Sequence, residues 1–138
     1  MTPYSYDRRC ASADLYKSVL GDPRYGEGHR YPKWNIRPTV LDEPRLFPQV
    51  FPELTRSDHA RLAGNFERRA KEMQVDHYKA IERNEQKYGD TGPLISGGLR
   101  DHWPEDAKDE VRYLAHGYTL LSKAADAHKA ATRLRRIP

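Results

Sequence analysis

Residues 55–88 carry a repeating hydrophobic pattern that predicts one long amphipathic helix. The apolar positions recur at intervals of three, four and their sums, which places them on one helical face: Leu62, Phe66, Met73, Ala80 or Ile81, and Tyr88. Thr55 and Asp58 have the spacing of a capping box, and the Gly-Asp-Thr-Gly-Pro run at 89–93 ends the pattern. The apolar face is narrow, closer to a coiled-coil seam than to a core face, so this helix needs a partner.

A second helical pattern runs from about residue 104 to residue 136. Pro104, Glu105 and Asp106 suit a helix start, and the apolar positions that follow again have helical spacing: Val111, Leu114, Tyr118, Leu121, Ala125, His128, and Ala131 or Thr132. Gly117 lies inside this helix, and a tolerated cost of about 1 kcal/mol is a simpler interpretation of it than a close helix contact. Because about fifteen residues join two helices of similar length, the sequence predicts an antiparallel hairpin over residues 55–138.

Residues 1–54 form a proline- and tyrosine-rich arm ahead of the predicted hairpin. A short helix is expected from Asp7 or Ser12 to Leu20, because a Gly-Asp-Pro run follows it. Six prolines between residues 23 and 52 favour extended or polyproline geometry with turns. Bulky apolar residues along this stretch are unlike a solvated linker, so we expect it to lie across its own hairpin and across another subunit. Residues 46–52 (Leu-Phe-Pro-Gln-Val-Phe-Pro) are the best candidate for docking on the hairpin seam.

The composition limits the size of the hydrophobic core. The chain has 138 residues, 37% of them hydrophobic and 32% charged, and its mean hydropathy is −0.96. We therefore expect a single, mainly α-helical domain that is either marginally stable alone or completed by a partner. The sequence has no apolar run long enough for a membrane span, no secretory signal, and only one cysteine, Cys10. These features favour an intracellular protein of the cytoplasm or an organelle, the mitochondrion included, over a secreted one.

The net charge of +4 is unevenly distributed along the chain. Residues 1–55 carry eight basic and seven acidic side chains, residues 56–122 carry eleven and twelve, and residues 123–138 carry five and one. The basic excess therefore belongs to the last helix, where Lys129, Arg133 and Arg136 share one face. Such a stripe is most simply a solvated face, and the alternative is a contact with RNA, DNA, acidic lipid or an acidic subunit.

The six histidines are the first candidates for a metal site: His29, His59, His77, His102, His116 and His128. Asp58-His59 and Asp76-His77 recur on one helix face, but their 18-residue spacing separates them by about 27 Å, too far to share one metal. His77 and His116 are candidates to face each other near the middle of the hairpin. Neither long helix contains a Glu-x-x-His or His-Glu-x-x-His motif, so we interpret the histidines as surface or seam residues.

Nucleophilic and nucleotide-binding signatures are also missing from the sequence. Cys10 follows Arg8 and Arg9, which would lower a thiol pKa, but no positioned base accompanies it. The P-loop, Gly-x-Ser-x-Gly and Gly-x-Gly-x-x-Gly motifs do not occur. The sequence therefore predicts no catalytic, cofactor-binding or metal-ligating residues, and a protein that is not an enzyme.

A Pro/Tyr-rich arm followed by a long helical hairpin is typical of a subunit that holds its neighbours together. We expect a non-catalytic structural or accessory subunit of a large intracellular assembly. The predicted partner-binding residues are Trp34, Phe47 and Phe51 in the arm and Lys129, Arg133 and Arg136 in the last helix. The alternative is a nucleic-acid-associated protein that binds RNA or DNA through its basic C-terminal helix.

Overall fold

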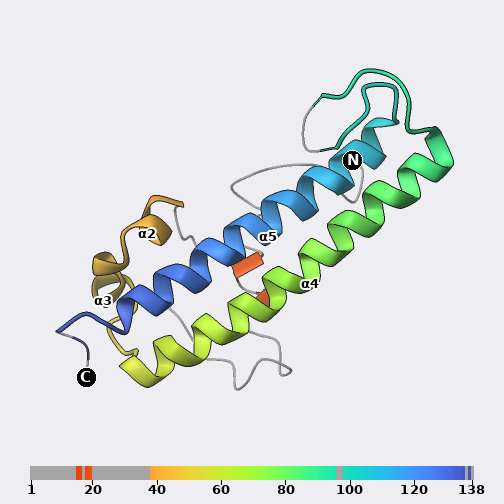
Figure 1. The fold of residues 1–138 in the computed structure, drawn as a ribbon. Coiled ribbons are helices and arrows are strands. Elements are labelled where there is room, and N and C mark those ends of the chain that lie inside the picture. The colour runs from red at the N-terminus through yellow and green to blue at the C-terminus, as the bar shows by residue number, and fades with distance from the viewer. Residues whose placement is uncertain (1–14, 17, 20–37, 96–97, 136, 138) are drawn as a thin grey trace.

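The computed structural model describes residues 15–16, 18–19, 38–95, 98–135 and 137. Over these residues the protein is mainly α-helical, and two long helices, α4 (Arg56–Tyr88) and α5 (Glu105–Ala131), pack against each other as the predicted antiparallel hairpin (Figure 1). We call the end where α4 begins and α5 finishes the open end, and the opposite end the loop end. The only strand-like pairing in the described part is an isolated bridge between Leu94 and Arg100 in the connecting loop.

Helix α4 begins and ends where the sequence predicts. Thr55 Oγ1 accepts a hydrogen bond from the backbone N–H of Asp58 (3.2 Å), and the Asp58 carboxylate accepts one from the backbone N–H of Thr55 (3.0 Å). This reciprocal pair is a complete capping box, which satisfies two backbone donors that the first turn leaves free. Gly89 ends the helix at φ 98°, a conformation that a side chain disfavours.

Helix α5 begins after Pro104 as predicted but ends at Ala131, five residues before the predicted end at 136. Thr132 and Arg133 continue as turns whose N–H groups bond to His128, Lys129 and Ala130 carbonyls. The Arg56 guanidinium, from the first turn of α4, donates to the carbonyls of Thr132 and Leu134. The chain after Ala131 is therefore turned toward α4, a constraint from outside the helix that no local pattern contains.

Residues 38–50 form short helical turns, which corrects the extended geometry expected for the proline-rich arm. Helix α2 spans Pro38–Asp42, the 3-10 helix η2 spans Pro44–Leu46, and α3 spans Phe47–Val50. Pro44 and Pro48 stand in the first turn of η2 and α3, where the missing N–H costs nothing and the fixed φ suits a helix. The prolines therefore keep each helix short instead of preventing helices. In the expected first helix, Leu15, Tyr16, Ser18 and Val19 are helical, and its other residues lie outside the described part.

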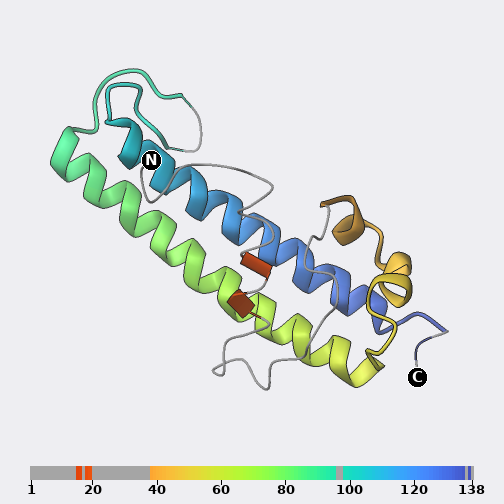
Figure 2. The same cartoon turned by 180° about the vertical axis from the view of Figure 1, so that it is seen from behind.

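The main hydrophobic core lies at the open end, where segments distant in sequence cover the α4–α5 seam (Figure 2). Leu62, Phe66 and Met73 of α4 face Leu120, Leu121 and Ala124 of α5. The 15–19 segment and the 38–54 segment complete this cluster with the following buried residues: Leu15, Tyr16, Val19, Leu41, Phe47, Phe51 and Leu54. The docking of residues 46–52 on the hairpin seam is thus confirmed, and the chain itself supplies much of the partner that the narrow stripe requires.

A smaller core lies at the loop end, and a close helix contact joins the two. Ala80, Leu99, Trp103 and Val111 form this second cluster, and Trp103 Nε1 donates to the Gly89 carbonyl at 2.9 Å. Between the clusters, a Cβ on Gly117 would lie 2.2 Å from Met73 Cε. Gly117 therefore marks a close approach to Met73, contrary to the interpretation as a tolerated glycine. No described helix is both long and apolar enough to cross a bilayer.

Candidate functional site

Three buried polar side chains meet at the centre of the main core. A hydrogen bond of 2.6 Å joins the Tyr16 hydroxyl to His128 Nε2, and a second of 2.9 Å joins His128 Nδ1 to His59 Nδ1. The three residues come from the 15–19 segment, α5 and α4 respectively, so this chain of hydrogen bonds connects three separate parts of the fold. Both histidine side chains are fully buried.

Aromatic rings surround this triad. The ring centroids of Phe47, Phe66 and Phe51 lie 4.7, 5.4 and 6.1 Å from that of His128. Burial, with a smaller contribution from neighbouring His59, holds the pKa of His128 well below its usual value. Burial also lowers the pKa of His59, although the Asp58 carboxylate opposes the shift. Both imidazoles are therefore neutral at neutral pH.

Neutral imidazoles restrict how the protons are arranged, because one Nδ1 must donate and the other must accept. If Tyr16 donates to His128, then His128 donates to His59, and His59 Nε2 carries a hydrogen. If the direction is reversed, His59 Nε2 carries a lone pair. In either arrangement His59 Nε2 is buried without a hydrogen-bond partner, which costs about 1–3 kcal/mol. The triad lies inside the core, and its clearest role is to bind the 15–19 segment to both long helices.

His77 is a second buried histidine, nearer the middle of the hairpin. Both of its ring nitrogens are buried without a hydrogen-bond partner, and burial lowers its pKa. Its ring packs edge-on against Tyr78 and Tyr118, with centroid distances of 5.5 and 5.3 Å. The residue placed against it from α5 is thus Tyr118, where the sequence suggested His116. Among the described residues, no three histidine, cysteine, aspartate or glutamate side chains gather as metal ligands would.

The predicted partner-binding residues fall into three groups. Phe47 and Phe51 are buried against His128 of this chain's own Tyr16–His128–His59 triad, so their rings are packed within the fold. Lys129 is exposed on α5 and forms an ion pair of 3.5 Å with Glu67 of α4, whereas Arg133 is exposed just after α5. Trp34 and Arg136 lie outside the described residues. The structure therefore places the aromatic pair inside and leaves the two described basic residues outside.

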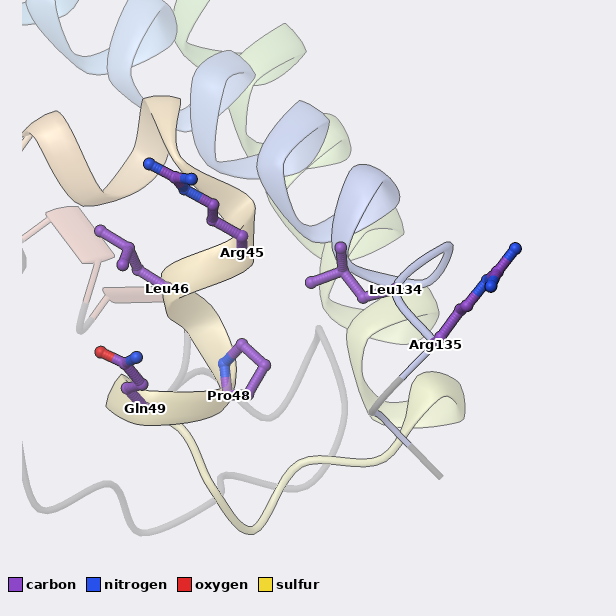
Figure 3. Close-up of a pocket in the computed structure, with 6 residues that line it drawn as sticks. All are labelled: Arg45, Leu46, Pro48, Gln49, Leu134 and Arg135. Carbon is purple, nitrogen blue, oxygen red and sulfur yellow. The ribbon is translucent and has the colours of Figure 1, made fainter.

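An open groove lies at the open end, outside the main core (Figure 3). Its volume is about 470 Å³, and its lining residues come from the η2–α3 segment and from the turn after α5: Arg45, Leu46, Pro48, Gln49, Leu134 and Arg135. Leu46, Pro48 and Leu134 are half-buried, and both arginines are exposed. No local sequence pattern marks this groove, because the two segments that form its walls lie on either side of the whole hairpin in the sequence.

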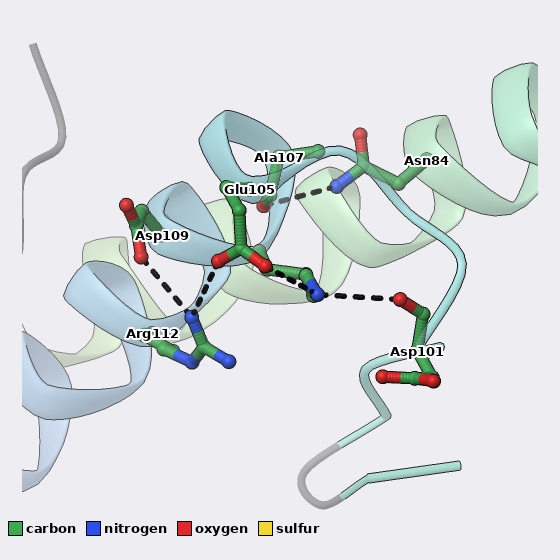
Figure 4. Close-up of polar contacts among 7 residues, drawn as sticks. Asn84, Asp101, Glu105, Ala107, Asp109 and Arg112 are labelled. Carbon is green, nitrogen blue, oxygen red and sulfur yellow. Dashed lines mark hydrogen bonds and ion pairs between the residues drawn. The ribbon is translucent and has the colours of Figure 1, made fainter. Parts of the chain in front are cut away.

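Ion pairs and hydrogen bonds connect the side chains at the loop end, where α5 begins (Figure 4). The buried Lys108 ammonium forms an ion pair of 2.7 Å with Glu105 and donates to the Asp101 carbonyl at 3.2 Å. The hydrogen bond and charge of Lys108 lower the pKa of Glu105. Arg112 adds an ion pair of 3.1 Å with Asp109. These partners account for the charges within the fold, so this network fixes the start of α5.

The exposed large hydrophobic side chains of the described residues all lie in the half of the hairpin that contains the loop, two of them just past the middle of α4. Val75 and Tyr78 of α4 are 51% and 60% exposed, and Leu94 and Ile95 of the loop are 60% and 47% exposed. Val75 and Tyr78 are one turn apart and so share a helix face. The loop approaches the same half of α4, because a Cβ on Gly98 would lie 3.0 Å from Ile81 Cδ1. We call Val75, Tyr78, Leu94 and Ile95 the loop-end apolar residues.

Comparison of the chain with protein families, curated proteins and solved structures finds no match.

Proposed function

We propose that this protein is a non-catalytic structural or accessory subunit of a larger assembly and that it binds a neighbouring subunit through the loop end of its hairpin. The observation that carries the proposal is the concentration of the loop-end apolar residues in one half of the molecule. Scattered exposed hydrophobic residues are normal on protein surfaces, whereas grouped ones are typical of interaction sites.

The polar groups support the same proposal. His128, whose pKa is lowered well below its usual value, lies fully buried in the core, where a substrate has no access to it. The buried Lys108 is held by Glu105 and by a backbone carbonyl. In both cases the polar group bonds to other parts of the same chain and connects elements of the fold. We further assign the assembly to the inside of the cell, in the cytoplasm or an organelle, because a single cysteine provides no disulfide framework.

Affinity capture of the tagged chain under native conditions tests this function. We expect the wild-type chain to retain defined partner proteins, and we expect Val75→Glu and Tyr78→Glu to lose them because a buried, unpaired charge opposes an apolar interface. Gln74→Glu is the matched control, since it adds the same charge at an exposed neighbouring position of α4. Partners that remain bound to both apolar-to-acidic variants would contradict the proposal.

A second candidate function, nucleic-acid binding, is favoured by the exposed Arg133 and Arg135. No acidic side chain of the described residues forms an ion pair with either arginine, so both are available to phosphate groups. Binding through them would weaken steeply with added salt, because neutralising phosphates releases counterions. A labelled RNA or DNA whose binding is insensitive to salt, or survives Arg133→Glu with Arg135→Glu, would exclude this candidate.

A further inference from the structure

The groove at the open end has two apolar walls that come from distant parts of the chain. Leu46 and Pro48 provide one wall, and Leu134 provides the other (Figure 3). Its volume of about 470 Å³ lies within the range of sites that bind small molecules or peptide side chains. These side chains are half-buried and therefore partly available to an incoming apolar group.

Both walls are anchored to the core from behind. Phe47, between Leu46 and Pro48, is fully buried against His128 and His59. On the other side, the Arg56 guanidinium holds the Leu134 carbonyl, and Ile137 is buried in the main core. Neither wall needs to form on binding, so a ligand would lose less free energy in ordering the site than it would at a flexible one.

Two exposed arginines lie beside the apolar walls of the groove. Arg45 and Arg135 leave opposite walls and extend outward (Figure 3). Arg45 forms an exposed ion pair of 3.1 Å with Glu43, which contributes little in water. Among the described residues, no acidic side chain forms an ion pair with Arg135. The last sixteen residues, 123–138, carry five basic side chains and one acidic one, so the wall to which Leu134 and Arg135 belong comes from a basic stretch of the chain.

We propose that this groove binds an acidic peptide segment of a partner subunit. An apolar side chain of the peptide lies between the Leu46–Pro48 wall and the Leu134 wall, and neighbouring carboxylates of the peptide pair with Arg45 and Arg135. This inference rests on the proposed function as a subunit and adds a second contact, at the opposite end of the hairpin from the loop-end apolar residues. A peptide fits the groove better than a nucleic acid does, because the described residues that line it include no aromatic ring on which a base would stack.

The test measures binding of short fluorescent peptides to the full chain by anisotropy. The probe has one leucine flanked on both sides by glutamates, and two control peptides replace the leucine by serine or the glutamates by glutamines. We expect the probe to bind, both control peptides to bind more weakly, and Arg45→Glu with Arg135→Glu to weaken the probe by about tenfold or more. Lys79→Glu with Lys87→Glu is the matched control, because it makes the same charge change on exposed residues at the loop end.

Several outcomes would overturn this inference. They are a probe that does not bind, a probe whose affinity is unchanged by the groove variant, and a single-stranded oligonucleotide that binds at the groove more tightly than the probe. Thermal unfolding of each variant shows that it is folded, since all four substituted side chains are exposed. The proposed function fails separately: partner capture that depends on Tyr78 but not on the groove arginines would leave the function standing and exclude the groove.

Discussion

The open end and the loop end of the hairpin use the same two helices but differ in the polar groups that they bury and in the hydrophobic side chains that they expose. The open end buries an uncharged Tyr16–His128–His59 triad among phenylalanine rings and exposes no large hydrophobic residue of the described part. The loop end surrounds a smaller core with ion pairs, such as Lys108–Glu105, and exposes all four loop-end apolar residues.

This difference indicates a division of labour along one hairpin. Burial of apolar surface is the dominant favourable term in folding, so most of the folding free energy should arise at the open end, where the larger cluster lies. Exposed ion pairs contribute little to stability, so the loop end is held mainly by its small core and its hydrogen bonds. Three predictions test this comparison, from the largest expected effect to the smallest.

Removing a phenylalanine ring at the open end should have the largest effect. Phe47→Ala leaves a cavity beside His128 and loosens the 38–54 segment, so we expect the free energy of unfolding to fall by about 3–5 kcal/mol. Tyr78→Ala at the loop end is the comparison variant, and its effect should be within about 0.5 kcal/mol because the ring is exposed. Urea unfolding followed by circular dichroism measures both values. Equal losses in the two variants would contradict the prediction that most of the folding free energy arises at the open end.

Acidification should destabilise the protein, chiefly at the open end, because His59 and His128 there, and His77 nearer the middle of the hairpin, all have lowered pKa values. The pKa values of His59 and His128 are lowered from 6.5 in the folded protein, so below that pH the unfolded chain binds more protons than the folded one. Stability is therefore fully present above pH 6.5 and falls as the pH drops toward the folded-state pKa values, by up to about 1.4 kcal/mol per pH unit for each histidine.

Urea unfolding at about pH 7.5 and about pH 5.5 measures this loss, which we expect to reach about 2 kcal/mol. His128→Phe removes one titrating group, so the stability of this variant should depend less on pH whatever its absolute value. If the wild-type chain has the same free energy of unfolding at both pH values, then protonation of the buried histidines does not destabilise the folded state. Neutral histidines would then not be required for the packing of the open end.

Gly117→Ala tests the contact that joins the two cores. Alanine favours a helix over glycine by about 1 kcal/mol, but the new Cβ would overlap the buried Met73 side chain. The overlapped atoms, Met73 Sδ and Cε, are the flexible end of that side chain, but Met73 is buried, so they can shift only by repacking the core around them. We expect this overpacking to offset the gain in helix propensity and to leave a net loss of up to about 1 kcal/mol. Gly64→Ala in α4 is the matched control: nothing lies within 4 Å of its Cβ position, so this variant should be slightly stabilised. Thermal unfolding compares the two, and a stabilised Gly117→Ala would contradict the close approach.

The hairpin could be predicted from the sequence because its signals are local. The Thr55–Asp58 capping box and the glycine at position 89 fix the bounds of α4, and the apolar spacing fixes its inner face. The buried face also contains His59, His77 and Asn84, which continue the same spacing of three, four and their sums. Their polarity kept them out of the predicted stripe, although their positions alone identify them as seam residues.

The remaining features depend on contacts between distant parts of the chain. The end of α5 at Ala131 depends on Arg56, whose guanidinium binds the carbonyls that follow the helix. The groove depends on Leu134 lying opposite Pro48, which only the folded hairpin brings about. The helical turns at 38–50 had a local signal, because Pro44 and Pro48 suit the first turn of a helix. A proline breaks a helix only in its interior, so the close spacing of the prolines does not exclude short helices that begin at them.

The Arg56 guanidinium has a consequence for how the protein opens. It bonds the first turn of α4 to the carbonyls of Thr132 and Leu134, and so holds the turns that follow α5 against that helix. Loss of these bonds releases the last turn of α5 and the first turn of α4 together. The two helix ends, 76 residues apart in sequence from Arg56 to Thr132, should therefore behave as one cooperative unit in amide hydrogen exchange. A side chain, and not a disulfide, thus links the start of α4 to the turns that follow α5.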